Sequence, residues 1–326
     1  MNAVAAPLAL KRDLLTGTEW SPAQLRDFFR LSTEIKAHPD RYRTALGGSM
    51  FVMIFEKPSL RTRVTFETGI ASMGGSSTFL DHTAAKLSER EPVRDIARNL
   101  ERWVQGIVAR VFAQETLDEL AANANIPVIN ALSDKFHPCQ ALADFFTLEE
   151  RFGSLRGLKV AYVGDGNNMC HSLLTIGARA GAHIRVATPA GYEPDPAIVA
   201  ESKRVARETR GKIEILRAPE DAVSGAQAVY TDVWASMGQE AEAADRSKTF
   251  APFQVNRKLF SYAAKHAVFM HCLPAHRGDE VAAAIIDSPR SVVFDQAENR
   301  LHVQKSILVL LLEGGTHRFP PRSANA

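Results

Sequence analysis

A run of residues suited to binding a phosphate, Ser59-Leu60-Arg61-Thr62-Arg63, begins shortly after a predicted strand at 50–55. Apolar residues at helical spacing beyond it predict a helix that begins near Ser59, and serine is a common N-cap. Two arginines in the first turn oppose the positive end of the helix dipole, which costs about 0.3–1 kcal/mol each when exposed. A bound dianion reverses that sign, because backbone N–H groups, hydroxyls and guanidinium groups then all face negative charge. We therefore expect a phosphate site here, with an ordinary serine cap as the alternative.

A histidine lies beside a proline at the start of another predicted helix. Pro138 suits the first helical position, so His137 and Gln140 lie about one turn apart, shortly after a predicted strand at 127–130. On its own, such a histidine more often has a structural role than a catalytic one. Metal binding by His137 and Cys139 is disfavoured, because a tetrahedral site needs further ligands at a recognisable spacing.

A glycine turn at 164–169 follows the next predicted strand and invites comparison with the dinucleotide-binding fingerprint. Met169 stands where the fingerprint has its last glycine, and the following strand ends without the carboxylate that binds ribose. A nucleotide-dependent oxidoreductase is therefore disfavoured. What remains is a turn that presents the amides of Asn167 and Asn168 at a helix start.

Two more strands end in residues that could bind a substrate. Asp232 follows a predicted strand at 228–231, and Cys272 follows one at 267–271. Taken separately, Asp232 could be a turn former and Cys272 a buried small apolar residue. A carboxylate, a thiol, an amide and a hydroxyl gathered at the strand ends of one sheet predict a site for a polar, cationic, amino-acid-like ligand.

These loops need sheets that bring their strand ends to one edge. The chain alternates short β-rich runs with amphipathic segments, which is typical of α/β proteins with parallel sheets, and such sheets bind ligands beyond the carboxyl ends of their strands. The predicted strands are 50–55, 106–112, 127–130, 159–163, 184–187, 228–231, 267–271 and 292–295. We expect two domains, 1–148 and 149–326, each a mainly parallel sheet flanked by helices, with a last helix at about 298–313.

Length and composition limit the other possibilities. The chain has 326 residues, 45% of them hydrophobic, which is enough for about two cores of ordinary size. A formal net charge of +2 gives no global attraction to nucleic acid or to an anionic membrane. The longest aliphatic run, 307–312, is far shorter than the roughly 20 residues of a membrane-spanning helix. Three cysteines without a C-x-x-C pair disfavour a disulfide framework or a structural zinc site, and indicate a reducing, cytosolic compartment.

Taken together, these segments resemble the aspartate/ornithine carbamoyltransferases along nearly the whole chain. Residues 59–63 are similar to the family's carbamoyl phosphate loop, and residues 137–140 to its second phosphate-substrate segment. Residues 232–238 and 271–274 resemble the loops of its ornithine-specific members. The resemblance implies transfer of a carbamoyl group from carbamoyl phosphate to the δ-amine of L-ornithine, giving L-citrulline and phosphate. A modified ornithine or another amine is the alternative acceptor, and no metal or organic cofactor is implied.

The resemblance also implies roles for individual residues. Carbamoyl phosphate would be bound by Ser59, Leu60, Arg61, Thr62, Lys86, Arg110, His137, Gln140 and Arg300. L-Ornithine would be bound by Asn168, Asp232, Ser236, Met237, Cys272 and Leu273. The catalytic residues would be Thr62, Arg110, His137 and Cys272. The first three would donate hydrogen bonds to the carbonyl oxygen as negative charge develops there, and the thiol would help to select the neutral amine.

The resemblance further implies how the chain assembles. Similar proteins are homotrimers, so we expect a homotrimer or a multiple of trimers with active sites shared between subunits, a last helix that packs back on the first domain, and a cis Leu273–Pro274 bond. The sequence departs from the family pattern at Leu60, where many ornithine enzymes have threonine, and at Lys86, where bacterial ones commonly have a glutamine that reaches a neighbouring subunit. We expect small-molecule substrates, no nucleic acid, no membrane and a cytoplasmic location.

Overall fold

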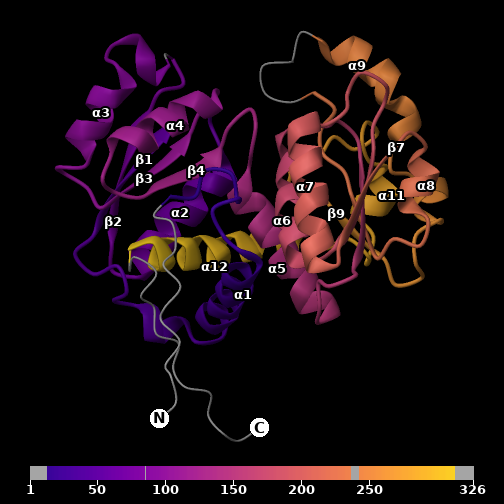
Figure 1. Ribbon diagram of the computed structural model, residues 1–326, viewed down its shortest axis with the longest axis horizontal. Helices are drawn as coiled ribbons and strands as arrows, with labels where there is room; N and C mark the ends of the chain where they lie inside the picture. Colours follow the sequence, from indigo (N-terminus) through magenta and orange to yellow (C-terminus); the bar gives the residue numbers. More distant parts are fainter. Residues whose placement is uncertain (1–12, 85, 236–241, 313–326) are drawn as a thin grey trace, which may run out of the picture.

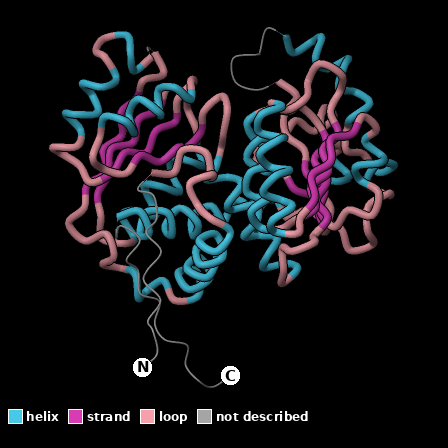
Figure 2. The backbone as a smooth tube through the Cα atoms, in the orientation of Figure 1, coloured by secondary structure: helices cyan, strands magenta, loops and turns pink. Residues whose placement is uncertain are grey.

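The structure, a computed structural model, describes residues 13–84, 86–235 and 242–312 of the chain. Two parallel sheets form the centres of its two halves, with helices on both sides of each sheet (Figures 1 and 2). The strand order is β2-β1-β3-β4 in the first sheet and β7-β6-β5-β8-β9 in the second. This arrangement confirms the predicted α/β fold.

The first sheet carries the phosphate-loop segment of the sequence at the end of its strand β1. Its strands are β1 (Met50–Phe55), β2 (Ser76–Asp81), β3 (Gly106–Arg110) and β4 (Val128–Leu132). β3 and β4 are buried at every position, because helices cover both faces of the sheet. The surrounding helices are α1 (Pro22–Ala37), η1 (Pro39–Tyr42), α2 (Leu60–Ser72), η2 (Leu87–Glu89), α3 (Val93–Leu100), α4 (Gln114–Asn123) and α5 (Pro138–Phe152).

The second sheet carries the loops that contain Asp232 and Cys272. Its strands are β5 (Lys159–Val163), β6 (His183–Ala187), β7 (Lys212–Leu216), β8 (Ala228–Tyr230) and β9 (Val268–Met270). Its helices are α6 (Asn168–Ala180), α7 (Pro196–Thr209), α8 (Pro219–Val223), α9 (Ala243–Phe250), η4 (Ala251–Phe253), α10 (Arg257–Phe260) and α11 (Ala283–Ile286). The last helix of the described chain is α12 (Val293–Leu312). Since all pairings are parallel, the ends of β5, β8 and β9 lie at the same edge.

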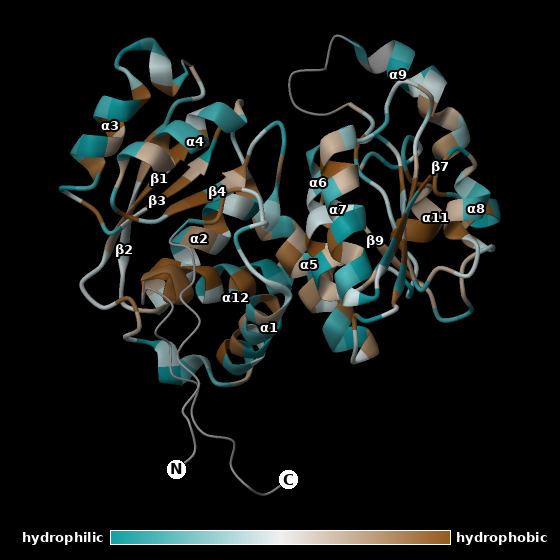
Figure 3. Cartoon of the chain, viewed as in Figure 1, coloured by the Kyte–Doolittle hydropathy of each residue, from teal (hydrophilic) through white to brown (hydrophobic). Residues whose placement is uncertain are grey.

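The last helix joins the two halves. α12 packs against α5, α1 and α2, and in Figure 1 its yellow ribbon lies among the indigo and purple helices of the first half. A hydrogen bond of 3.0 Å between the Ser32 and Ser306 hydroxyls fixes α12 to α1. One apolar core runs through both halves at this junction, and Figure 3 shows hydrophobic strands enclosed by helices with hydrophilic outer faces. The expectation that the last helix packs back on the first domain is confirmed.

Three elements differ from the sequence prediction. Residues 292–295 are not a strand, because a single bridge at Ser291 is followed directly by α12, which therefore begins before the predicted residue 298. A short apolar run fits either state by periodicity alone. The strands β2 and β7 were not predicted: β2 is a polar strand at the sheet edge, and β7 is only partly buried.

Candidate active site

The polar residues at the strand ends of the two sheets face one another between the two halves of the chain. Hydrogen bonds link the segment 133–137 to the start of α6: the Asn168 side-chain amide donates to the Ser133 carbonyl oxygen at 2.7 Å, and the His137 backbone N–H donates to the Ser172 hydroxyl at 2.7 Å. Arg61 and Cys272 also lie close enough to influence each other's pKa. The two loop sets predicted from the sequence therefore form one site.

Ser59 caps α2 as predicted. Its backbone is extended, and its hydroxyl accepts a hydrogen bond from the Thr62 backbone N–H at 3.3 Å. Leu60 is 76% exposed, so it can offer the site little beyond its backbone N–H. Arg63 turns away, since its guanidinium pairs with Glu67 at 3.0 Å and stacks 3.7 Å from the Phe79 ring centre. Of the two arginines in this turn, only Arg61 remains available to a ligand.

Three guanidinium groups, those of Arg61, Arg110 and Arg300, lie close together in the first half of the site. Burial, followed by the positive charges of Arg300 and Arg61, lowers the pKa of Arg110 to about 10. Burial likewise lowers the pKa of Arg61 and of Arg300. Neither Arg61 nor Arg300 pairs with a carboxylate within 4.0 Å in the described part of the chain. Such a cluster of positive charge is suited to a bound anion.

His137 is a neutral imidazole at the edge of this cluster. Burial, and then the charges of Arg300, Arg110 and Arg61, hold its pKa well below the usual value of 6.5. Its Nδ1 atom is buried and has no hydrogen-bond partner among the described residues. A neutral ring offers one N–H donor and one acceptor, so it can donate to a substrate oxygen without adding charge.

Arg300 connects two of the predicted residues. Its Nη1 donates to the Gln140 side-chain carbonyl and its Nη2 to the Thr62 hydroxyl, both at 2.7 Å. Because the Thr62 oxygen accepts from Arg300, its own hydroxyl proton is free to point elsewhere. The helix α12 thus brings a residue far along the chain next to α2 and α5.

The second half of the site has a carboxylate at its centre. Asp232 accepts hydrogen bonds from the Cys272 thiol at 3.0 Å, the Val233 N–H at 2.8 Å and the Asn167 amide at 3.0 Å. Burial, together with the charge of Asp232, raises the pKa of the Cys272 thiol well above its usual value of 9.0. Cys272 is therefore a thiol at neutral pH. The predicted residues Ser236 and Met237 lie outside the described residues.

The loop after β9 has a constrained backbone. Leu273 has a φ of 58°, and the Leu273–Pro274 peptide bond is cis, as expected. His271 Nδ1 accepts from the Leu273 N–H at 2.8 Å, so its Nε2–H donates to Glu280 at 3.2 Å. Ligand atoms of Asp232, His271 and Cys272 lie within 4.8 Å of one another, yet both His271 nitrogens already make hydrogen bonds. The geometry favours hydrogen bonding over metal binding here.

Glu56 was not recognised from the sequence. It is 4% exposed, and its two oxygens accept from the backbone N–H groups of Leu87 at 2.8 Å and Phe112 at 2.7 Å. It therefore ties the loop before α2 to the segment after Lys86 and to the end of β3. Lys86 is exposed, and its Nζ lies 5.9 Å from the Phe112 ring centre. In the described part of the chain, no hydrogen bond or salt bridge joins Lys86 to the site of its own chain.

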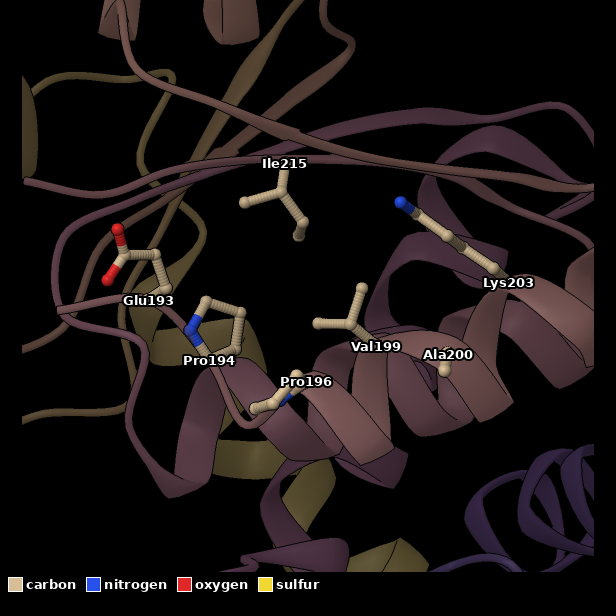
Figure 4. Close-up of a pocket in the computed structure, with 7 residues that line it drawn as sticks. All are labelled: Glu193, Pro194, Pro196, Val199, Ala200, Lys203 and Ile215. Carbon is tan, nitrogen blue, oxygen red and sulfur yellow. The ribbon is translucent and has the colours of Figure 1, made fainter. Parts of the chain in front are cut away.

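A hollow of about 350 Å³ between α7 and β7 lies apart from this site (Figure 4). It is lined by Glu193, Pro194, Pro196, Val199, Ala200, Lys203 and Ile215. Its walls are mainly apolar, and none of the hydrogen-bonded site residues reaches it. The site at the strand ends is the better candidate for an active site, because it gathers charged and hydrogen-bonding side chains.

Two family models and several known proteins match this chain over most of its length. The family model for the aspartate/ornithine carbamoyltransferase carbamoyl-P binding domain matches residues 12–150, and the model for the Asp/Orn binding domain matches residues 156–311. The ornithine carbamoyltransferase of Thermococcus kodakarensis is 49% identical over 308 residues, which cover 93% of this chain and 97% of that protein. The one from Thermus thermophilus is 50% identical over 307 residues, 94% of this chain and 98% of that protein. The structure of ornithine carbamoyltransferase from Pyrococcus furiosus matches with a TM-score of 0.91 and 47% identity, over 95% of this chain and 99% of that one.

Proposed function

This chain belongs to the aspartate/ornithine carbamoyltransferase family, and from that premise we propose how its residues perform the reaction. The enzyme transfers the carbamoyl group of carbamoyl phosphate to the δ-amine of L-ornithine, giving L-citrulline and phosphate. The arrangement of charge supports the roles that we assign to the residues. A guanidinium cluster with a neutral histidine lies on one side of the site, and the Asp232 carboxylate with a neutral thiol lies on the other.

The phosphate of carbamoyl phosphate binds at the start of α2. The backbone N–H groups of this first turn, the Ser59 hydroxyl and the Arg61 guanidinium supply the donors. The buried Arg110 adds a second positive charge. An anion here relieves the mutual repulsion of Arg61, Arg110 and Arg300, which is the electrostatic support for this assignment.

The carbonyl oxygen of the carbamoyl group lies where Thr62, Arg110 and His137 can donate to it. The Thr62 hydroxyl proton is free because Arg300 already donates to its oxygen. The neutral His137 ring donates a single N–H. When the δ-amine attacks the carbamoyl carbon, negative charge builds on this oxygen, and losing one such donor typically raises the barrier by about 2.7–4 kcal/mol.

In the proposed chemical step, the two substrates supply all the bonds and protons that change. The lone pair of the neutral δ-amine forms the new C–N bond, the bond between carbon and the phosphate oxygen breaks, and phosphate leaves with that electron pair. The leaving phosphate takes the proton that the attacking amine loses. Because Cys272 is held as a thiol, it places no negative charge beside the δ-amine and so does not favour the unreactive ammonium form.

We assign Asp232 to the α-amino end of L-ornithine, with Asn168 and Leu273 beside it and Ser236 and Met237 completing the loop. The support is that Asp232 is a buried carboxylate with no salt bridge among the described residues, whereas the equally buried Asp165 pairs with Arg246 at 2.8 Å. Citrulline formation should therefore be fast with L-ornithine and slow with N-acetylornithine, because acetylation removes the cation that pairs with Asp232 and leaves the carboxylate unpaired. Putrescine keeps that cation but lacks the α-carboxylate, so it too should react more slowly than L-ornithine. Equal rates with N-acetylornithine would establish the alternative acceptor instead.

We further propose that the chain assembles as a homotrimer, or a multiple of it, in the cytoplasm. Leu60 and Val64, one turn apart on α2, are 76% and 48% exposed beside the edge strand β2, which suits burial against a second copy of this chain. The cytoplasmic location is supported by three cysteines that are all free thiols. No helix within the described ranges is long and apolar enough to cross a membrane.

Lys86 is proposed to complete the phosphate site of the neighbouring subunit. It is exposed in the segment that follows β2, and its ammonium can act as a point charge for phosphate. Lys86→Gln should raise the KM for carbamoyl phosphate more than that for ornithine. Mixing Arg61→Ala and Lys86→Ala chains should restore activity, because some hybrid sites combine both intact residues.

The matched control for this mixture pairs Arg61→Ala with Arg110→Ala. Both residues serve the same chain's site, so these hybrids should stay inactive. A Lys86 mixture no more active than its parents, with subunit exchange verified by mass, would mean that Lys86 does not act across subunits.

A further inference from the structure

Asp144 is a buried carboxylate at the junction of the two halves that none of the steps above uses. It lies on α5 with no exposed surface. Its Oδ1 accepts two hydrogen bonds, from the Gln140 side-chain amide and from the Gln296 side-chain amide, both at 2.8 Å. Gln140 lies one turn before Asp144 on α5, whereas Gln296 belongs to α12. One carboxylate therefore holds two glutamine amides that come from different helices.

The two glutamines face different parts of the active site. The carbonyl oxygen of Gln140 accepts from Arg300, which also donates to Thr62 on the carbamoyl phosphate side. The carbonyl oxygen of Gln296 accepts from the His271 backbone N–H at 3.1 Å, at the start of the loop that carries Cys272. Asp144 thus lies at the centre of a hydrogen-bonded chain from Thr62 to His271, across both substrate sides.

A carboxylate imposes a direction on this chain, because it accepts hydrogen bonds and donates none. Each glutamine must turn its NH₂ group toward Asp144, which leaves each carbonyl oxygen directed at the site. We propose that the Asp144 carboxylate is a positioning residue that fixes the orientation of both glutamine amides and so aligns the two substrate sides with each other. This inference rests on the function proposed above.

The charge of Asp144 can change within an accessible pH range. Burial raises its pKa to about 6, while the hydrogen bonds from Gln296 and Gln140, the Tyr230 hydroxyl and the charge of Arg300 oppose that rise. Arg300 faces it from α12, Tyr230 from β8 and Cys272 from the loop after β9. Once protonated, Asp144 is a weaker acceptor and gains an O–H donor, so it holds the Gln140 and Gln296 NH₂ groups less tightly. Protonation therefore loosens the alignment.

The experiment compares kcat across pH 5 to 9, with both substrates saturating, in the wild type, in Asp144→Asn and in Glu149→Gln. Asparagine keeps the shape but can turn either an acceptor or a donor toward each glutamine. Asp144→Asn should lower kcat at pH 8 by about tenfold to a hundredfold, as misplaced reacting groups do, with a smaller change in the KM for carbamoyl phosphate. The fall of wild-type kcat below about pH 6 should be absent in this variant.

Glu149→Gln is the matched control, since it makes the same change of acid to amide on α5 outside the network. It should behave as the wild type. If the wild type and this control form no citrulline, the proposed function fails. If both are active and Asp144→Asn keeps a normal kcat and the same fall near pH 6, the positioning role is refuted while the function stands.

Gln296→Met provides the test that does not depend on the folding of Asp144→Asn. It leaves the carboxylate in place but removes one of the hydrogen bonds that favour its charged form. The fall of kcat at low pH should therefore move to higher pH. An unmoved profile would overturn the proposal even if Asp144→Asn does not fold.

Discussion

Replacing Arg61 by alanine should have opposite effects on the free enzyme and on the enzyme with bound phosphate. In the free site, the charge of Arg61 lies near those of Arg110 and Arg300 and contributes to the lowered pKa of Arg110, about 10. Arg61 has no carboxylate partner within 4.0 Å among the described residues. Its removal relieves repulsion, so the free Arg61→Ala protein should be at least as stable as the wild type.

The bound state should lose stability by an amount that can be calculated. A hydrogen bond to a charged group contributes about 1.5–3 kcal/mol, which corresponds to a roughly 10–150-fold change in Kd. At a phosphate concentration of about 100 times Kd, binding stabilises the wild type by about 2.7 kcal/mol. If Arg61→Ala weakens binding about a hundredfold, the same concentration stabilises the variant by only about 0.4 kcal/mol.

Urea unfolding at 25 °C with and without inorganic phosphate, the product of the reaction, measures both effects. Arg63→Ala is the matched control, because Arg63 lies on the same turn of α2 but pairs with Glu67 and stacks on Phe79. It should keep the full phosphate-induced stabilisation. If Arg61→Ala also keeps it, or if the free variant is clearly less stable than the wild type, the assignment of Arg61 as the main phosphate ligand is wrong.

Two further predictions follow from buried acids. The raised pKa of the Cys272 thiol predicts that iodoacetamide alkylates it slowly at pH 8. Asp232→Asn should speed the alkylation, because it removes a negative charge that raises this pKa. Rapid alkylation of Cys272 in the wild type would contradict the prediction. Asp144 has a pKa of about 6 in the folded protein, against an ordinary value of 3.8. The folded state therefore binds this proton more tightly than the unfolded state does, and that binding stabilises the fold only at low pH. As the pH rises from about 4 to 6, the wild type should lose stability relative to Asp144→Asn. The loss should reach at most about 3 kcal/mol and then level off, and a difference in unfolding free energy that does not change between pH 4.5 and pH 7.5 would refute it.

Several residues that we assign to the substrates could be predicted because each follows a strand. In a parallel sheet the carboxyl ends of the strands meet at one edge, so Arg61, Asp232 and Cys272 are brought to two facing edges by the order of elements alone. Arg110, the last residue of β3, and Arg300 were assigned only through the family resemblance. No local pattern indicates that the last helix returns to the first sheet.

The supporting residues were missed for a different reason. Glu56 and Asp144 act through backbone N–H groups and amides that come from distant segments, and an isolated acid carries no signal of such partners. One pattern was available, however. Asp144 lies four residues after Gln140, and Gln296 lies four residues before Arg300. Each pair is therefore on one face of its helix, and polar pairs facing the core at this spacing predict a buried network.

The distribution of charge predicts that the two substrates do not exchange places. Burial keeps His137 and Cys272 neutral, and the charges that we assign to the substrates are the guanidinium cluster on the side of α2 and the Asp232 carboxylate on the side of β8. A phosphate dianion is attracted to the first and repelled by the second, and an ammonium group experiences the reverse. Because the site is buried, these interactions are screened less than they would be at the surface. We expect the uncharged amine to meet the carbamoyl carbon beside these neutral groups.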